Sequence, residues 1–240
     1  MRRMTLLVGA LLVFGTACKK KEETKTEAVK KDDKPAEPAA PATPPPTPTP
    51  APEAKMEPPP AAAQKKLFID VHELGAGKVK AADVAEAHKK DLATQGKHNV
   101  EFKAYWVDEK EGKVYCLSES PSAEETTATH KEAHGLMPSK VMEVTADAAS
   151  WTPTAGKNLY MDIHELGAGK VKAADVADAH KKDLAAQGKH DVKFLNYWVD
   201  EASGTVMCLS EAKKPEDTIA THKEAHGLIP KTVALVTEGR

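Results

Sequence analysis

Hydrophobic and polar positions recur in a pattern whose period changes along the chain. Residues 67–74 alternate between apolar and mixed side chains, which predicts a half-buried strand with His72 near its end. After a glycine-containing break, apolar residues return at helical spacing from Ala81 to Leu92, and Gly96 suits a helix C-cap. The first part of the pattern is therefore a strand followed by an amphipathic helix.

Two more strands, a second helix and a last strand complete the pattern. Residues 100–107 and 114–119 are rich in β-forming side chains and flank a polar turn, which predicts a hairpin. A helix is expected from Pro121 to Gly135, with acidic residues in its first turn, and residues 140–145 form the last predicted strand. The order strand, helix, strand, strand, helix, strand is that of a ferredoxin-like fold.

The whole pattern occurs twice, because residues 65–144 reappear at 157–236, offset by 92 positions without insertion or deletion. Each predicted unit covers only one face of its sheet with helices, so the other face needs a partner. The sequence thus predicts an α+β protein of two tandem ferredoxin-like domains. Their sheets are expected to pack as an intrachain pseudo-dimer, with Trp151 at their edge. The predicted boundaries are 65–145 for repeat 1, 146–156 for the connection and 157–238 for repeat 2.

The first quarter of the chain differs from the repeats. Residues 1–17 combine two arginines, a short apolar stretch and small residues before Cys18. They resemble a bacterial lipoprotein signal peptide, and an ordinary secretory signal is the alternative. Residues 18–64 are rich first in Lys and Glu and then in Pro and Ala, which predicts a disordered tether. We therefore expect a lipoprotein of the cell envelope, anchored to a membrane by lipid on Cys18 and facing the periplasm.

Charge and motifs argue against some classes of function. The 240 residues carry 34 Lys and Arg against 36 Asp and Glu, a formal net charge of -2. The basic residues are spread over predicted helices that are also rich in acids, so we expect no nucleic-acid partner. The sequence contains no Gly-rich phosphate loop and no recognisable serine nucleophile motif.

All ten histidines belong to the repeats, five in each. The sharpest local motif is His130-x-x-x-His134, because residues four apart share one face of a helix and can hold one metal ion. The alternative is that this pair only packs or caps the helix. Further candidate ligands near predicted strand ends are His72, Cys116 and Glu119. The equivalent candidates in repeat 2 are His164, Cys208, Glu211, His222 and His226.

The candidate ligands indicate a class of metal, but the sequence does not show which of them share one site. Cys116 and Glu119 should point to opposite faces of a regular strand, so either one, and not both, is expected to join the histidines. Imidazole with thiolate or carboxylate suits a divalent transition metal such as nickel or zinc. Because imidazole must be neutral to coordinate, metal affinity is expected to fall below about pH 6.5.

Other histidines and the cysteines have simpler interpretations. His88 lies in the apolar stripe of the first predicted helix and is expected to be a packed core residue. His98 follows the predicted C-cap and is expected to interact with the helix dipole. A disulfide between Cys116 and Cys208 would require both to lie near the pseudo-twofold axis, and buried free cysteines are the favoured alternative.

Several motifs in order carry a resemblance to a known family. These motifs are the segment 105–109 (Tyr-Trp-Val-Asp-Glu), the segment 116–119 (Cys-Leu-Ser-Glu), Pro121 and the His130 motif with its following Gly-Leu. Together they resemble a bacterial family of small ferredoxin-like domains of unknown function that includes nickel-binding proteins. The resemblance implies a domain that pairs with another, and nickel binding by His, Cys or Glu. Repeat 2 departs from it with Lys213 in place of Pro121.

Three functional hypotheses remain. The leading one is an envelope lipoprotein that binds a divalent transition metal, with nickel favoured, for sequestration or buffering. The second is an enzyme with a cavity between the two sheets, where His72 acts as a general base oriented by Glu119. The third is a non-catalytic binding or scaffolding module in which the histidines are structural.

Overall fold

The computed structural model describes residues 64–240. The predicted signal peptide, Cys18 and residues 18–63 of the tether lie outside the described residues. Among residues 64–240, no helix has the length and apolar character needed to cross a membrane.

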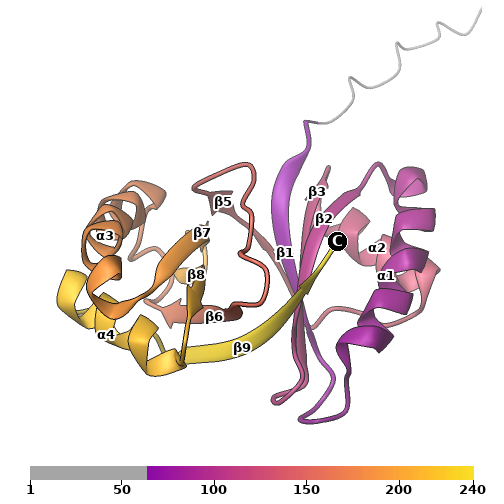
Figure 1. The fold of residues 1–240 in the computed structure, drawn as a ribbon. Coiled ribbons are helices and arrows are strands. Elements are labelled where there is room, and N and C mark those ends of the chain that lie inside the picture. The colour runs from indigo at the N-terminus through magenta and orange to yellow at the C-terminus, as the bar shows by residue number, and fades with distance from the viewer. Residues whose placement is uncertain (1–63) are drawn as a thin grey trace, which may run out of the picture. The chain divides into compact units, whose positions relative to one another are not determined.

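Each repeat forms two α-helices and a set of antiparallel strands (Figure 1). The elements of repeat 1 are β1 (Lys66–Glu73), α1 (Ala81–Thr94), the 3-10 helix η1 (Gln95–His98), β2 (Glu101–Asp108), β3 (Lys113–Ser120), α2 (Ala123–Ala133), β4 (Lys140–Glu143) and β5 (Thr145–Ala146). Those of repeat 2 are β6 (Asn158–Glu165), α3 (Ala173–Ala186), the 3-10 helix η2 (Gln187–His190), β7 (Lys193–Asp200), β8 (Thr205–Ala212), α4 (Pro215–Ala225) and β9 (Thr232–Gly239). The predicted α+β fold of two tandem ferredoxin-like repeats is confirmed.

The first helix of repeat 1 differs from its prediction in two details. Gly96 is not its C-cap, because α1 runs directly into the 3-10 turn and the chain reverses at Asn99, whose φ is 54°. Leu92 is 41% exposed, whereas Val84, His88 and Asp91 are the buried residues of the helix. Spacings of four and three residues place these three on one face, and Leu92 is rotated away from it.

The last strand of each repeat joins both repeats. The strands have the order β4-β1-β3-β2-β9-β6-β8-β7-β5 in one antiparallel sheet. In β9, residues 232–236 pair with β6 of the same repeat and residues 237–239 pair with β2 of the other. The corresponding segment of repeat 1 is divided into β4, which pairs with β1, and β5, which pairs with β7. Each repeat therefore completes the sheet of the other.

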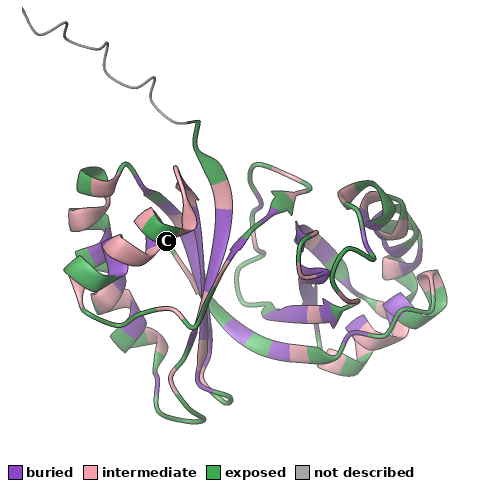
Figure 2. Cartoon of the chain, turned by 180° about the vertical axis from the view of Figure 1, so that it is seen from behind, coloured by how far each residue is buried: buried purple, intermediate pink, exposed green. Residues whose placement is uncertain are grey.

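Both faces of the strands are buried, but against different partners. One face packs on the helices, with α1 and α2 over β1–β3 and α3 and α4 over β6–β8 (Figure 1). The other face lies between the two halves of this sheet, one from each repeat and called the two sheets below, where apolar residues of both repeats form one cluster. Figure 2 shows buried residues along these strands. The predicted half-buried character of the first strand thus needs correction: Ile69 enters the core between the sheets, while Asp70 and His72 are buried on the helix side.

Three tryptophans occupy the core between the sheets. The rings of Trp106 and Trp198 lie 4.9 Å apart, and Trp151 lies 5.5 Å from the first and 5.3 Å from the second. The indole nitrogens of Trp106 and Trp151 both donate to Oε2 of Glu238, at 3.0 and 2.8 Å. The connection between the repeats is therefore part of the core that joins them, and Trp151 lies within this core, whereas the sequence predicted it at the edge of the sheets.

A groove of about 730 Å³ opens at one end of this region. It is lined by the turn between β2 and β3 and by residues of β6 and β9, and none of its lining residues is a histidine or cysteine. The residues proposed for catalysis or metal binding therefore do not line this groove.

Replacing Trp198 by Ala should strongly weaken the pairing of the repeats. Its side chain is fully buried among apolar groups from both sheets, so we expect the free energy of unfolding to fall by about 3–5 kcal/mol. Urea denaturation followed by circular dichroism measures this change. Leu235→Ala is the control, because Leu235 is 56% exposed and its loss should change stability by less than about 0.5 kcal/mol. Equal effects of the two substitutions would contradict the assignment of the core.

Candidate metal centre

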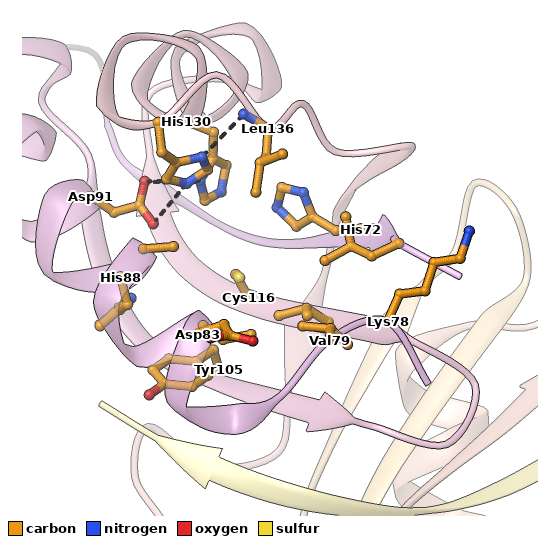
Figure 3. Close-up of a pocket in the computed structure, with 15 residues that line it drawn as sticks. His72, Lys78, Val79, Asp83, His88, Asp91, Tyr105, Cys116, His130 and Leu136 are labelled. Atoms are coloured by element: carbon orange, nitrogen blue, oxygen red, sulfur yellow. Dashed lines mark hydrogen bonds and ion pairs between the residues drawn. The ribbon is translucent and has the colours of Figure 1, made fainter. Parts of the chain in front are cut away.

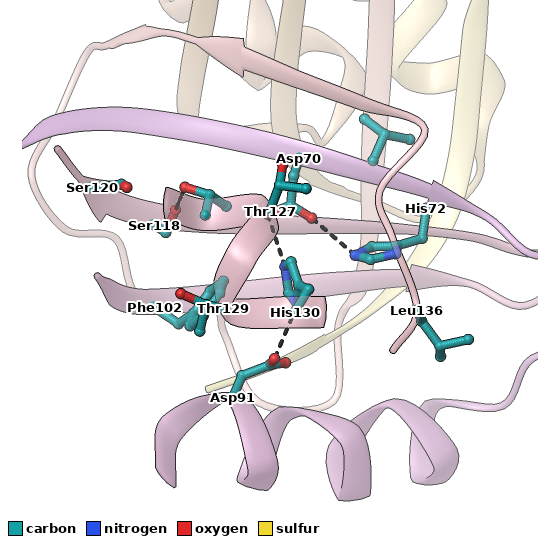
Figure 4. Close-up of polar contacts among 12 residues, drawn as sticks. Asp70, His72, Asp91, Phe102, Ser118, Ser120, Thr127, Thr129, His130 and Leu136 are labelled. Atoms are coloured by element: carbon teal, nitrogen blue, oxygen red, sulfur yellow. Dashed lines mark hydrogen bonds and ion pairs between the residues drawn. The ribbon is translucent and has the colours of Figure 1, made fainter. Parts of the chain in front are cut away.

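Four of the predicted ligands of repeat 1, His72, Cys116, His130 and His134, lie where β1, β3, α1 and α2 meet. Figure 4 shows two of them, His72 and His130, with Asp70 and Asp91. β1 carries Asp70 and His72 on its helix-covered face, and the antiparallel register sets Cys116 of β3 directly opposite Asp70. α1 contributes Asp91, and the last turn of α2 contributes His130. All five side chains are buried, with residue exposures of 5% or less. Four elements thus close around one polar cluster.

His130 is at the centre of this cluster, between two carboxylates. Its Nδ1 is 3.0 Å from Oδ1 of Asp91, and its Nε2 is 3.3 Å from Oδ2 of Asp70. Two acceptors on opposite sides of one ring are satisfied together only by an imidazolium that donates from both nitrogens. On the far side of Asp70, Nε2 of His72 lies 3.0 Å from Oδ1. The charge on His130 therefore links both helices to the sheet.

His134, the residue that ends α2, completes the cluster. Its Nε2 is 3.1 Å from Oδ1 of Asp91 and 3.3 Å from Nδ1 of His130. The backbone N–H of Leu136 donates to Nδ1 of His134 at 3.1 Å. Because Nδ1 is occupied as an acceptor, the proton of the neutral ring resides on Nε2. The Nε2 that faces His130 and Asp91 is thus a hydrogen-bond donor in this arrangement, and it could coordinate a metal only if its proton moved to Nδ1 and the hydrogen bond from Leu136 broke.

Electrostatics fix the charge of the central groups. Burial disfavours a charge on His130, but its hydrogen bonds to Asp70 and Asp91 outweigh this effect and raise its pKa to about 9. Burial raises the pKa of the Asp91 carboxyl, but hydrogen bonds from His130 and His134 outweigh burial and lower this pKa to about 2. Burial, followed by the nearby carboxylate charges, raises the pKa of the Cys116 thiol well above its usual value. The thiol is therefore neutral at pH 7.

The donor set fits a transition metal. In repeat 1 it forms two overlapping groups whose possible ligand atoms lie within 4.8 Å of one another. Oδ1 of Asp70 is buried and has no hydrogen-bond partner among residues 64–240, since its contact with His72 is not aligned as a hydrogen bond. Imidazole, thiolate and carboxylate together are the donors that nickel and zinc accept, so the Cys116 thiol would have to lose its proton on binding. The inner group is Asp70, His72, Cys116 and His130, and the outer group is Asp91, His130 and His134.

Repeat 2 reproduces the cluster with nearly the same distances. Nδ1 of His222 is 3.0 Å from Asp183, and its Nε2 is 3.3 Å from Asp162. Burial opposes the charge on His222, and interactions with the same two carboxylates raise its pKa to about 9. Unlike its counterpart in repeat 1, the contact of Nε2 with Asp162 is not aligned as a hydrogen bond. Nε2 of His226 is 3.1 Å from Asp183. The inner group here is Asp162, His164, Cys208 and His222, and the outer group is Asp183, His222 and His226.

The two glutamates among the predicted ligands lie outside these groups. Glu119 is on the opposite face of β3 from Cys116, and its carboxylate contacts Lys103 at 3.2 Å. Glu211 is buried and accepts a hydrogen bond from the backbone of Thr154 in the connection. The suggested pairing of His72 with Glu119 is therefore not formed, because Asp70 is the carboxylate beside His72.

The aspartates of the cluster were missed in the sequence. Asp70 alternates with Ile69 on the face that was expected to be half exposed, and Asp91 interrupts the apolar stripe that contains Val84 and His88. A carboxylate in an otherwise apolar stripe is unfavourable without a partner, so its position was a usable signal. The same signal is repeated at Asp162 and Asp183.

The remaining histidines and the thiols have separate surroundings. His88 is buried against the aromatic rings of β2, as expected. His98 does not simply follow a helix end: its Nε2 is 2.9 Å from the carboxylate of Glu132 on α2. Cys116 and Cys208 are free and buried, each in the cluster of its own repeat, which agrees with the favoured alternative to a disulfide.

Comparisons with known proteins match both repeats to one family. Residues 68–144 and 160–236 both match the family described as Nickel responsive protein SCO4226-like. The structure of SCO4226 from Streptomyces coelicolor A3(2) shares 38% identity, covering 32% of this chain and 93% of its own, with a TM-score of 0.31. No curated protein matches the chain.

Two other solved structures cover both repeats at low identity. A putative monooxygenase from Lactobacillus acidophilus NCFM has 9% identity, covers 73% of this chain and 94% of its own, and has a TM-score of 0.40. A mutant chlorite dismutase from Candidatus Nitrospira defluvii has 6% identity, covers 73% of this chain and 90% of its own, and has a TM-score of 0.41.

The charged cluster should make stability depend on pH in both directions. His130 and His222 have pKa values raised to about 9, so their stabilising charge is complete below the unfolded value of about 6.5 and is lost as pH rises through 9. Asp91 has a lowered pKa of about 2, so its contribution is present above about 4 and is lost as pH falls toward 2. Metal-free protein should therefore have its highest Tm between about pH 4 and 6.5.

Thermal denaturation in the presence of a chelator, at intervals from pH 3 to 9.5, measures this profile. The loss between pH 6.5 and 9 should be on the order of 3 kcal/mol per repeat. The matched control is the variant His130→Gln/His222→Gln, which should be less stable at pH 6 and lack the fall between pH 6.5 and 9. A Tm that rises over this interval would contradict the charge assigned to the cluster.

Proposed function

This chain belongs to the SCO4226-like family of nickel responsive proteins, and from this membership we propose that it binds divalent transition metal ions at the two histidine clusters. Nickel is the favoured ion and zinc is the competing one. The observation that carries the proposal is the duplicated convergence of imidazole, thiol and carboxylate donors, within 4.8 Å of one another in each repeat. One ion per repeat is the expected stoichiometry.

His130 is common to the inner and outer groups and is the residue on which binding in repeat 1 should depend most. Its Nδ1 faces the outer group and its Nε2 faces the inner group. His134 would offer Nε2 only after the proton on Nε2 moves to Nδ1, which breaks the hydrogen bond that Nδ1 accepts from Leu136. Coordination requires the proton on the chosen nitrogen to leave, because only a lone pair binds the metal. Proton and metal ion thus compete for the same position between Asp70 and Asp91.

The biological role that we propose is sequestration or buffering of the metal in the cell envelope. The lipoprotein-like sequence before Cys18 and the Pro/Ala-rich segment that follows support a protein tethered to a membrane at the periplasmic side. Two sites in one chain double the number of ions held at each anchor. The buried position of both clusters supports retention of ions over rapid transfer.

Calorimetric titration with nickel and with zinc at pH 7.5 tests the site directly. The purified protein should bind about two ions, with nickel bound more tightly. His130→Ala should lower affinity in repeat 1 by at least about 100-fold, and His130→Ala/His222→Ala should remove both sites. Circular dichroism checks that each variant remains folded.

The control for this experiment is His98→Ala together with His190→Ala, because these two histidines contact surface glutamates outside the clusters. The double variant should bind both ions with unchanged affinity. Absence of binding by the parent protein, or equal loss in the control, would overturn the proposed metal function.

The raised pKa of His130 predicts a different pH dependence from that of an ordinary histidine. Because this residue is protonated until about pH 9, nickel binding at pH 7.5 should release close to one proton per ion from it, and affinity should continue to rise between pH 6.5 and 9. Titrations in buffers of different ionisation enthalpy measure the protons released. An affinity that is constant above pH 6.5 would exclude His130 as a ligand.

A further inference from the structure

One edge of β9 is open along the first part of the strand. Residues 232–236 pair with β6 on one side, whereas β2 reaches the other side of β9 only at residues 237–239. β2 ends at Asp108 and is followed by a turn, so the groove of about 730 Å³ lies where a longer β2 would continue. Among residues 64–240, no strand pairs with this edge of residues 232–236.

This groove is separate from the candidate metal centre. The histidine clusters border the pockets beneath α1 and α3, of which Figure 3 shows the first. No residue lines both the groove and either of these pockets. The groove is bounded by both repeats, with the β2–β3 turn on one side and β6 and β9 on the other. A ligand in the groove would therefore leave the metal site free.

The corresponding edge in repeat 1 is protected by charged side chains. Unpaired N–H and C=O groups at a strand edge attract other strands, and proteins often block such edges with lysine. β4 is four residues long and carries Lys140 and Glu143. Nζ of Lys140 reaches the β7–β8 turn of the other repeat, 3.2 Å from Oγ of Ser203 and 3.8 Å from the carboxylate of Asp200. A lysine side chain thus occupies the place that corresponds to the groove.

The open edge of β9 lacks this protection. At the positions 92 residues after Lys140 and Glu143, β9 has Thr232 and Leu235. Both are exposed, Leu235 to 56%, and residues 232–236 (Thr-Val-Ala-Leu-Val) carry no charge. β-branched residues of this kind favour strand pairing. The edge that is blocked in repeat 1 is therefore available in repeat 2.

The groove retains the acidic residue that would face the missing lysine. Asp108 corresponds to Asp200, lines the groove and is 2% exposed. Among residues 64–240, no lysine or arginine forms an ion pair with its carboxylate, whereas Asp200 has Lys140. The other charged groups of the groove are already paired, in the contacts Lys80–Glu109, Lys110–Glu111, Lys113–Glu73 and Lys231–Glu165. The groove thus offers one carboxylate to a cation from outside.

We propose that the groove binds an extended segment of another protein, which pairs with the open edge of β9 and places a lysine side chain against Asp108. The paired length is about five residues, or roughly 17 Å, set by residues 232–236. Main-chain hydrogen bonds would supply affinity, and contacts with alternate side chains would supply specificity. The lysine would do between two proteins what Lys140 does within this chain. The proposal does not depend on metal binding.

The test uses the peptide fluorescein-Thr-Val-Lys-Val-Thr-amide as the probe, titrated with the full-length protein and followed by fluorescence polarisation. One peptide should bind per chain. Replacing its lysine by glutamate should weaken binding at least about tenfold. Two further peptides carry N-methyl groups on alternate residues, either the odd or the even ones. The version methylated on the N–H groups that face β9 should not bind, and the other should bind like the probe.

Variants of the protein test the edge and the carboxylate. Thr232→Lys installs the residue of repeat 1 and should weaken probe binding at least about tenfold. Its matched control is Thr152→Lys, which adds the same charge at an exposed threonine outside the groove and should leave binding unchanged. Asp108→Asn should weaken binding of the probe about tenfold but not that of a peptide with norleucine in place of lysine. Circular dichroism checks that each variant is folded.

Three results would overturn the proposal. The first is failure of the parent protein to bind the probe, and the second is equal binding of both N-methylated peptides. The third is self-association of the parent, seen by sedimentation and abolished by Thr232→Lys, because the edge would then be covered by a second copy of this chain. Unchanged binding by a folded Thr232→Lys variant would likewise exclude the edge of β9 as the docking site.

Discussion

The imidazolium of His130, held between the carboxylates of Asp70 and Asp91, is the interaction on which the packing of repeat 1 depends. Two buried carboxylates without a cation would repel each other and remain unsolvated, which costs several kcal/mol. The positive charge between them lets α1, α2 and β1 approach closely enough to exclude water. The centre therefore requires a cation, and a proton on His130 supplies it. The proposed metal ion would meet the same requirement.

The two faces of each sheet form different kinds of core once the repeats are paired. The side of each sheet that faces the other repeat is apolar and contains three tryptophans, whereas the side beneath the helices contains the charged clusters. Each cluster is built entirely from its own repeat, while the sheets are completed by strands from the other. Stability is thus shared between the two halves of the chain, and the chemistry is local to each half.

The sequence predicted the fold well because hydrophobic periodicity and the duplication are strong, local signals. It predicted the histidines of the cluster and Cys116 as candidates, but it could not group them, since the grouping depends on the register that sets Cys116 opposite Asp70. Asp70 and Asp91 escaped notice because a carboxylate is usually exposed, and only the packing of both strand faces shows that these two are buried. Glu119 was nominated from its position near a strand end, where parity directs it to the other face of the sheet.

Fusion of the two halves into one chain has a consequence for how the protein can change over evolutionary time. In an assembly of two identical subunits, every mutation occurs on both sides of the symmetry axis at once, so a benefit on one side is tied to any harm on the other. A single gene encoding both halves removes that tie. Lys140 and Thr232, which occupy corresponding places on the open edges of β4 and β9, are a difference that only such a chain can keep. One half is thereby free to acquire a new specificity while the other preserves the ancestral one.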